Sequence, residues 1–171
     1  MTINVNVPQG TSALSVTLPQ NALQSLISAG AGSLTISGNG SFPPLTIDLK
    51  ALKALQKQAN GEATLKFTVP SVLSKYARKL IGDRPVVGMS ASYVKRGKVR
   101  SISRLSGAGF VSIPYTLLPG EVAEHLFGIA IDSRGNTTRV RGSYYDEASG
   151  CLIIPVKSMS IMYGIGYRAA R

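Results

Sequence analysis

The sequence predicts an α+β protein made mostly of strands, in which duplicated strand-helix-strand units precede an antiparallel β-meander or sandwich-like module. Three observations favour this fold class. The chain has 171 residues, of which 44% are hydrophobic and only 16% charged, a balance typical of a neutral-polar β protein large enough to form a core without disulfides. In the first half a pattern repeats after 29 residues, and in the second half short strand patterns alternate with turn residues.

Residues 1–10 are predicted to form an N-terminal strand or arm. Thr2 to Val7 alternate between polar and apolar side chains, as in a β-strand, and Pro8-Gln9-Gly10 separates them from the rest. Because no basic segment followed by an apolar run begins the chain, this segment is predicted to be a strand and not a signal peptide. No stretch reaches roughly 18 consecutive apolar residues, the length of a membrane-spanning helix, and no transmembrane segment is predicted.

Residues 11–84 are predicted to contain the two copies and a third helix. Shifting the sequence by 29 residues aligns Val16-Thr17-Leu18 with Leu45-Thr46-Ile47, and Thr35-Ile36 with Thr64-Leu65. Each copy therefore reads as a strand, a short helix and a second strand.

The helices of the two copies have residues that suit their ends. Pro19 suits the first turn of the first helix, and Gly30 to Gly32 are expected to terminate it. Asp48 is a candidate N-cap of the second helix, and Asn60-Gly61 is expected to end it.

A third helix is predicted from Ser71 to Ile81, before the stop signal Gly82-Asp83-Arg84-Pro85. Apolar residues recur there at helical spacing and are expected to form a stripe that faces the core. This stripe consists of Val72, Leu73, Tyr76, Ala77 and Leu80.

Residues 85–171 are predicted to form an antiparallel β module that makes one compact unit with the preceding region. The spacing of the last strands favours a meander, with turns expected at Arg96-Gly97, Asp132 to Asn136 and Tyr145 to Gly150. Cys151, the single cysteine, is predicted to be a buried hydrophobic residue. The expected strands are Val86 to Lys95, Lys98 to Ser103, Phe110 to Tyr115, Phe127 to Ile131, Thr137 to Arg141, Cys151 to Val156 and Ile161 to Tyr167.

Basic residues are concentrated in residues 75–104. The net charge is +11, and in this region nine basic residues stand against Asp83 alone, which favours attraction to a polyanion. The alternative, that the same charges form a solvated face that discourages edge pairing, stays open. The candidate polyanion-binding residues are Lys75, Arg78, Lys79, Lys95, Arg96, Lys98, Arg100 and Arg104.

No pattern of catalytic or cofactor-binding residues is found in the sequence. His125 and Cys151 stand alone and offer no ligand cluster for zinc. The loops lack the spaced Asp and Asn residues of a calcium cage, and the glycine-rich segments do not continue as phosphate-binding loops. Asp132 and Asp146 sit at strand-to-turn junctions and are expected to cap turns. The sequence therefore predicts a protein that is not an enzyme and that binds no cofactor.

Several turn and strand segments together resemble a module of bacterial surface-layer-associated proteins, which often precedes S-layer-homology anchoring repeats. The resemblance extends upstream to about Leu14, although the basic turn Lys95 to Lys98 replaces an acidic or neutral one, and no S-layer-homology repeat is present. The segments that carry it are Val111 to Tyr115, Pro119-Gly120-Glu121, Ile131 to Asn136, Gly142 to Asp146, Ser149-Gly150 and Tyr163 to Tyr167.

The resemblance implies an extracellular or cell-surface protein. We expect a structural role, in which the protein assembles or spaces through β-sheet contacts as a homo-oligomer or filament, with Thr2 to Val7 available to extend a neighbour's sheet. A carbohydrate or anionic wall-polymer binding module is the alternative, in which Tyr115, Tyr144 and Tyr145 would stack on sugars. A nucleic-acid or anionic-membrane binder is a second alternative, although the chain has no recognisable nucleic-acid-binding motif.

Overall fold

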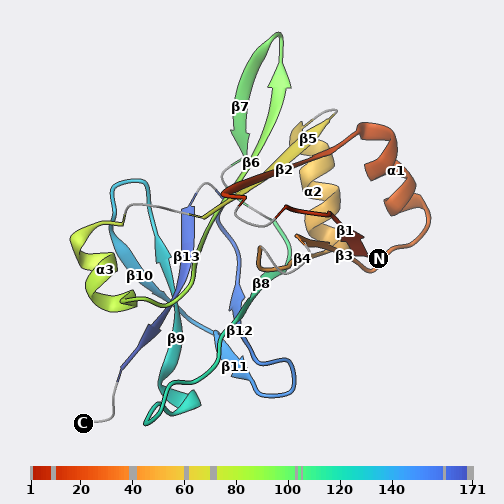
Figure 1. Cartoon of the computed structure of the whole chain (residues 1–171). Helices are drawn as coiled ribbons and strands as arrows, with labels where there is room; N and C mark the ends of the chain where they lie inside the picture. Colours follow the sequence, from red (N-terminus) through yellow and green to blue (C-terminus); the bar gives the residue numbers. More distant parts are fainter. Residues whose placement is uncertain are drawn as a thin grey trace.

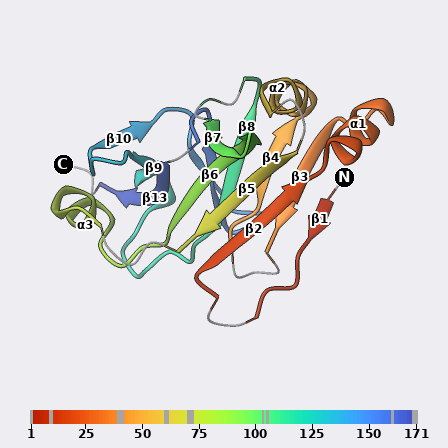
Figure 2. The ribbon, with the colours of Figure 1, turned by 90° about the horizontal axis from the view of Figure 1, so that it is seen from above.

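The chain folds into two β-sheets, sheet A and sheet B, with helices at their margins (Figures 1 and 2). The computed structural model describes residues 2–8, 11–38, 42–59, 62–69, 73–102, 104, 106–159 and 161–168. Strands predominate over helices, and nearly all strand pairs are antiparallel. The predicted fold class, α+β and mostly β, is confirmed, and the two sheets are compatible with a sandwich.

Sheet A has the strand order β1-β3-β4-β8-β12-β11. β1 runs parallel to β3, and every other pair in this sheet is antiparallel. Its strands are β1 (Thr2–Asn4), β3 (Ser33–Ser37), β4 (Leu45–Asp48), β8 (Gly109–Pro114), β11 (Tyr144–Asp146) and β12 (Cys151–Pro155).

Sheet B has the order β10-β9-β13-β6-β5-β2, and all of its pairs are antiparallel. A further strand, β7 (Lys98–Ile102), pairs with the end of β6, and the resulting hairpin projects from the body of the protein (Figure 1). The other strands are β2 (Ala13–Leu18), β5 (Ala63–Thr68), β6 (Val86–Lys95), β9 (Leu126–Ile131), β10 (Thr137–Val140) and β13 (Ile161–Tyr167).

The last strands do not form the predicted meander. β8 pairs with β12 in sheet A, while β9 pairs with β13 in sheet B, so the chain crosses between the sheets. The reason lies in β9, which buries side chains on both of its faces and therefore needs cover from both sides. Leu126 packs in the main core, whereas Phe127 and Ile129 pack beneath the helix that contains Ala77 and Ile81. Both predicted regions contribute strands to each sheet, and one main core includes residues from Val16 to Ile165.

Two helices, α1 (Gln20–Ser28) and α2 (Leu49–Ala59), complete this main core. α2 contacts strands of both sheets, and its Leu52 and Leu55 are buried between them. As predicted, Asp48 caps α2, because its Oδ1 accepts a hydrogen bond of 2.9 Å from the Ala51 amide. The predicted helix end at Asn60-Gly61 lies outside the described residues.

The third helix, α3 (Lys75–Ile81), covers part of the outer face of sheet B. It begins later than predicted, because Ser74 is its N-cap: the Ser74 Oγ accepts a hydrogen bond from the Ala77 amide at 3.2 Å and donates one to the Gly135 carbonyl at 2.7 Å. Ser71 and Val72, the predicted start, lie outside the described residues.

The predicted apolar stripe of α3 is wrong in two of its residues. Tyr76 is 75% exposed and Leu80 is 41% exposed, whereas Ala77 and Ile81 are buried against β9. The reason is on the sheet side, where Gly164 leaves room for Ile81: a Cβ on Gly164 would lie 2.9 Å from the Ile81 Cδ1. The helix therefore packs through a narrower face than its sequence predicts.

Two local predictions in the C-terminal region are also corrected. Tyr145, predicted in a turn, lies in the strand β11. Cys151, predicted to be buried, is half-buried, because Leu152 and Ile154 take the core-facing positions of the alternating strand β12. None of the helices in the described residues has the length and hydrophobicity of a membrane span.

Candidate functional site

The structure divides the predicted polyanion-binding residues into three groups. Lys75, Arg78 and Lys79 lie on α3, and Arg104 follows β7. The largest group is on the β6–β7 hairpin, which both views place well away from α3 (Figures 1 and 2). Its members are Lys95, Arg96, Lys98 and Arg100.

The β6–β7 hairpin has two different faces. Its register pairs Lys95 with Lys98 and Val94 with Val99, and Arg96-Gly97 forms the turn with φ values of 52° and 74°, as a two-residue hairpin turn requires. Because side chains alternate along a strand, the lysine pair lies on one face and the valine pair on the other. The two valines are 64% and 72% exposed. The hairpin is thus a projecting ribbon with a basic face and a small apolar face.

On α3, Lys75, Arg78 and Lys79 are all exposed, as is Tyr76 between them. The Arg78 guanidinium donates a hydrogen bond of 3.4 Å to the Leu73 carbonyl, so part of this side chain serves the helix start. These residues form a separate basic surface on the opposite side of the molecule from α1 and α2 (Figures 1 and 2).

Arg104 lies in a hollow of about 430 Å³. The hollow joins the segment after β7 to the loop between β12 and β13, which are linked by a β-bridge between Arg104 and Ser158. The described residues that line it are Arg104, Ser106, Gly107, Lys157 and Ser158. Sequence reasoning missed Lys157, because nothing in the sequence indicates that it lies beside Arg104.

The three candidate sugar-stacking tyrosines differ in exposure. Tyr144 is exposed, whereas Tyr115 and Tyr145 are half-buried. The Tyr145 hydroxyl donates a hydrogen bond of 2.8 Å to the Tyr115 carbonyl, and the Tyr115 hydroxyl donates one of 2.5 Å to Glu121. Of the three, Tyr144 has the ring that a sugar can reach most freely.

The most shielded charged pair joins Arg84 to Glu121 at 2.5 Å, with side chains 19% and 8% exposed. The Glu121 carboxylate also accepts hydrogen bonds from the Tyr115 hydroxyl and, at 2.8 Å, from the Leu118 amide. Burial by itself raises the pKa of Glu121, but these hydrogen bonds outweigh it and lower the pKa below its ordinary value. Glu121 is therefore ionised at neutral pH.

This cluster holds the loop after β8 against two other parts of the fold. The Arg84 guanidinium lies 5.3 Å from the centroid of the Tyr167 ring, and the Tyr167 hydroxyl accepts a hydrogen bond of 3.1 Å from the Val122 amide. The turn before β6, the loop from 115 to 122 and the end of β13 are thus tied together. Sequence reasoning missed this cluster, because Arg84 and Glu121 appear only as parts of two separate turns.

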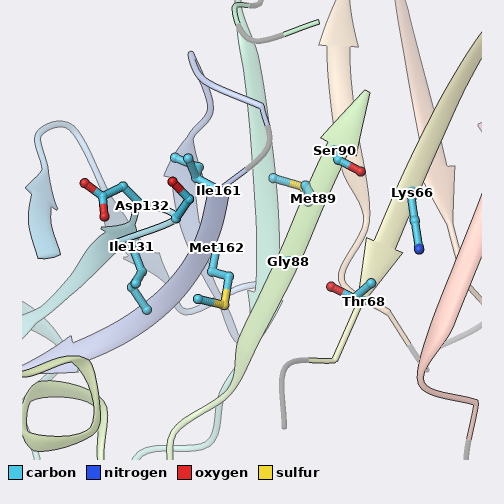
Figure 3. Close-up of a pocket in the computed structure, with 10 residues that line it drawn as sticks. Lys66, Thr68, Gly88, Met89, Ser90, Ile131, Asp132, Ile161 and Met162 are labelled. Atoms are coloured by element: carbon cyan, nitrogen blue, oxygen red, sulfur yellow. The ribbon is translucent and has the colours of Figure 1, made fainter. Parts of the chain in front are cut away.

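A shallow groove of about 290 Å³ crosses the outer face of sheet B (Figure 3). Gly88 opens it in the middle of the sheet, and Met162 forms part of its wall. Lys66 and Asp132 lie on opposite sides of it (Figure 3). The Asp132 carboxylate is occupied by its own turn, where it accepts hydrogen bonds from the Arg134 and Asn136 amides at 2.9 Å, and these lower its pKa.

A second hollow, of about 530 Å³, is mostly apolar. It lies beside the turn before β6 and is lined in part by Phe42, Val69, Pro85 and Ile113. Its cation, Arg84, is already bonded to Glu121. The hollow therefore offers mainly apolar space.

Three acidic side chains of the C-terminal region have structural partners. Glu121 is paired with Arg84, Asp132 caps its turn, and the Asp146 carboxylate accepts a hydrogen bond of 2.6 Å from Ser149. Among the described residues, no group of three or more His, Cys, Asp or Glu side chains could hold a metal ion. His125 packs against Tyr167, with ring centroids 5.8 Å apart.

Comparisons with models of known protein families, with curated proteins and with solved structures found no match to this chain.

Proposed function

We propose that this chain is a non-enzymatic structural protein of the bacterial cell surface or extracellular space, which assembles with copies of itself through the edges of its sheets. The observation that carries the proposal is an asymmetry between the edges. Each sheet has one edge strand from the N-terminal region and one from the C-terminal region, and the two kinds differ in charge.

The N-terminal edges are β1 in sheet A and β2 in sheet B. Both belong to a stretch of 47 residues, Met1 to Ile47, that contains no Asp, Glu, Lys, Arg or His. β2 is six residues long and its sequence, Ala13 to Leu18, has no proline. Unpaired strands without charge or proline are the ones on which another chain can pair.

The C-terminal edges carry the charges that usually protect a strand. β10 contains Arg139 and is followed by Arg141, and β11 ends at Asp146 before Glu147. Charged side chains on an edge discourage pairing with another chain. The contrast supports an assembly in which new strands are added at β1 and β2 only.

The N-terminal arm supports a modified form of the expected strand addition. β1 pairs with β3 of its own chain, Thr2 beside Thr35, and the Val5 amide donates a hydrogen bond of 2.9 Å to the Ser37 carbonyl. Because β1 is already paired within its own chain, it is not free to add to a neighbour's sheet. We propose instead that neighbouring copies pair along the outer edges of β1 and β2.

We also propose that residues 16–36 and 45–65 are copies of one unit, as the 29-residue repeat predicts. The pairing supports this: Thr17 faces Thr64 and Thr35 faces Thr46, and the shift of 29 residues converts one pair into the other. The Oγ1 atoms within the two pairs lie 3.2 and 2.8 Å apart. The copies would thus be related by a local two-fold axis.

This duplication strengthens the case for β2 as an assembly edge. By the same shift, β2 corresponds to β4, and the outer edge of β4 is paired antiparallel with β8. The corresponding edge of β2 has no partner strand among the described residues. If a strand of a neighbouring copy paired with this edge of β2, as β8 pairs with β4, the two copies of the unit would have equivalent neighbours.

The assembly edge is tested by adding one positive charge to it. Ala13 is exposed on β2 and faces Thr68 of β5, and we expect Ala13→Lys to raise the dissociation constant of self-association by about 10-fold or more, since a lysine on an edge strand discourages pairing and would lose hydration in the contact. Sedimentation velocity over a range of concentrations measures this. Thr138→Lys, on the charged edge strand β10, is the matched control and is expected to leave association unchanged. A wild-type protein that stays monomeric at every concentration contradicts the proposal.

A second candidate function is binding of an anionic wall polymer, and the hairpin favours it. The face of the hairpin that carries Lys95 and Lys98 also carries Arg100, with Arg96 at the tip and no acidic residue between Val86 and Arg104. A projecting ribbon of this kind can reach the phosphates or carboxylates of an extended polymer. Nucleic acid and anionic membranes offer similar charges and are alternative partners.

Two triple variants test this second candidate at equal net charge. Lys95→Ala/Lys98→Ala/Arg100→Ala removes three charges from the hairpin, and Lys75→Ala/Arg78→Ala/Lys79→Ala removes three from α3. We expect the hairpin variant to weaken binding to poly(glycerol phosphate) by about 100-fold, since each cation at an anionic surface contributes about 1 kcal/mol. The α3 variant is expected to bind nearly as the wild type does. Equal losses in both variants would indicate diffuse attraction and no hairpin site.

A further inference from the structure

We propose that the hollow beside Arg104 is a binding site for a single phosphate group. It lies outside the sheet edges and the tip of the hairpin, and it depends on neither proposed function. Its walls come from two segments far apart in the sequence, the residues after β7 and the loop between β12 and β13. The Arg104–Ser158 bridge holds these segments together.

The donors in this hollow match a tetrahedral oxyanion. Arg104 can donate two parallel hydrogen bonds to a phosphate, and Lys157 adds a second positive charge. The hydroxyls of Ser106 and Ser158 can both donate. No described residue that lines the hollow is acidic, so an anion would meet donors on several sides.

The two cations have no acidic partner in the part of the chain that the structure describes. Among the described residues, neither Arg104 nor Lys157 forms a salt bridge, and the pair that does form one, Arg84 and Glu121, lies in a different cluster. Both side chains are exposed, so they repel each other only weakly in water, and an anion between them would be attracted by both.

Gly107, which lines the hollow, packs against the start of α2. Its φ is +101°, and a Cβ at this position would lie 2.7 Å from the Ala51 amide nitrogen. The amino end of this helix is capped by the Asp48 carboxylate, whose Oδ1 accepts a hydrogen bond from the Ala51 amide. Arg104 and Lys157 carry two positive charges, against the single negative charge of Asp48.

The site is tested by titrating the full chain with inorganic phosphate at constant ionic strength and following backbone amide resonances. We expect saturable shifts at Ser106, Gly107 and Ser158. Arg104→Ala and Lys157→Ala are each expected to weaken binding by about 10-fold or more, because charge-assisted hydrogen bonds are the strong ones. Arg104→Lys, which keeps the charge but loses the planar fork, is expected to lose less. If Arg104→Ala does not fold, Arg104→Lys is the variant that tests the role of this side chain.

Matched controls and two further ligands make the result decisive. Arg134→Ala and Lys79→Ala remove the same charges at exposed positions elsewhere, and they are expected to bind phosphate within about 2-fold of the wild type, as distant surface changes do. Glycerol 3-phosphate and poly(glycerol phosphate) distinguish a free monoester from a phosphodiester chain. The proposal is overturned if phosphate gives no saturable shift, if the controls lose as much as the site variants, or if the Arg104→Ala/Lys157→Ala double variant binds all three ligands unchanged.

Discussion

Glu121→Ala is expected to lower the free energy of unfolding by about 3 kcal/mol and the midpoint of thermal unfolding by roughly 6 to 12 °C. The substitution removes the acceptor of hydrogen bonds from Arg84, Tyr115 and the Leu118 amide. It leaves a guanidinium that is only 19% exposed without its carboxylate. Breaking a shielded pair from one side is costly, because the remaining charge stays desolvated. Chemical denaturation and calorimetry measure the change.

Glu124 provides the matched control for this prediction. It is the same residue type three positions later, and it is exposed. Glu124→Ala is expected to change the free energy of unfolding by less than about 0.5 kcal/mol, as is usual for surface positions. In the double variant Arg84→Ala/Glu121→Ala the loss should be smaller than the sum of the single losses, because no unpaired charge remains. Additive losses would mean that the pair does not act as a unit.

The stability loss caused by Glu121→Ala is expected to depend on pH. The pKa of Glu121 is lower in the folded protein than its ordinary value of about 4.3 in an unfolded chain. Its contribution to stability is therefore complete above that ordinary value, and it is lost as the pH falls through the lowered, folded value. The difference in unfolding free energy between wild type and Glu121→Ala should be constant near neutral pH and shrink in acid. If this difference in unfolding free energy does not change with pH, the ionised carboxylate of Glu121 is not the source of the stability.

Local features of the fold were accessible from the sequence because they depend on neighbouring residues. The β6 strand was predicted from Val86 to Lys95 and is observed there, and the turn at Arg96-Gly97 follows from Gly97, which tolerates positive φ. Asp48 was identified as a helix cap for a similar reason, since the cap bond reaches only three residues along the chain.

Pairings between distant strands were not accessible in the same way. The alternation of β9 and β13 is compatible with either a meander or a crossing between sheets, and only the cover required on both faces of β9 decides between them. The orientation of α3 depends likewise on the sheet beneath it. Tyr76 has the spacing of a core residue. Because Gly164 has no side chain, Ile81 can pack closely against the sheet, and in this orientation of the helix Tyr76 is exposed.

In the candidate sites, too, features set by neighbouring residues could be predicted and contacts between distant segments could not. The sequence identifies every basic residue of the hairpin, and their register makes one face basic. It does not indicate that Arg104 lies beside Lys157, or Arg84 beside Glu121, because these contacts join separate loops. The absence of charge before Asp48 is visible in the sequence, but its meaning depends on knowing that β1 and β2 are edge strands.

Gly107→Ala is expected to lower the free energy of unfolding by about 3 kcal/mol, from backbone strain and overpacking together. The φ of +101° disfavours any residue with a side chain. The new Cβ would also lie 2.7 Å from the Ala51 amide nitrogen and 2.7 Å from the Asp48 Oδ1. Since one of these is backbone, the loop must move, which threatens the cap of α2 and the 2.9 Å hydrogen bond from the Asp48 amide to the Ala108 carbonyl.

Gly30→Ala separates the two causes. Gly30 also has a positive φ, of +73°, but a Cβ there meets nothing within 4 Å. We expect this variant to lose only about 1 kcal/mol, the cost of the left-handed backbone conformation for a residue with a side chain. The difference of about 2 kcal/mol between the variants then measures the close approach of the loop to α2, in the range known for overpacked sites. Equal losses in chemical denaturation would show that the contact between Gly107 and the helix start yields at little cost, and that φ alone requires glycine there.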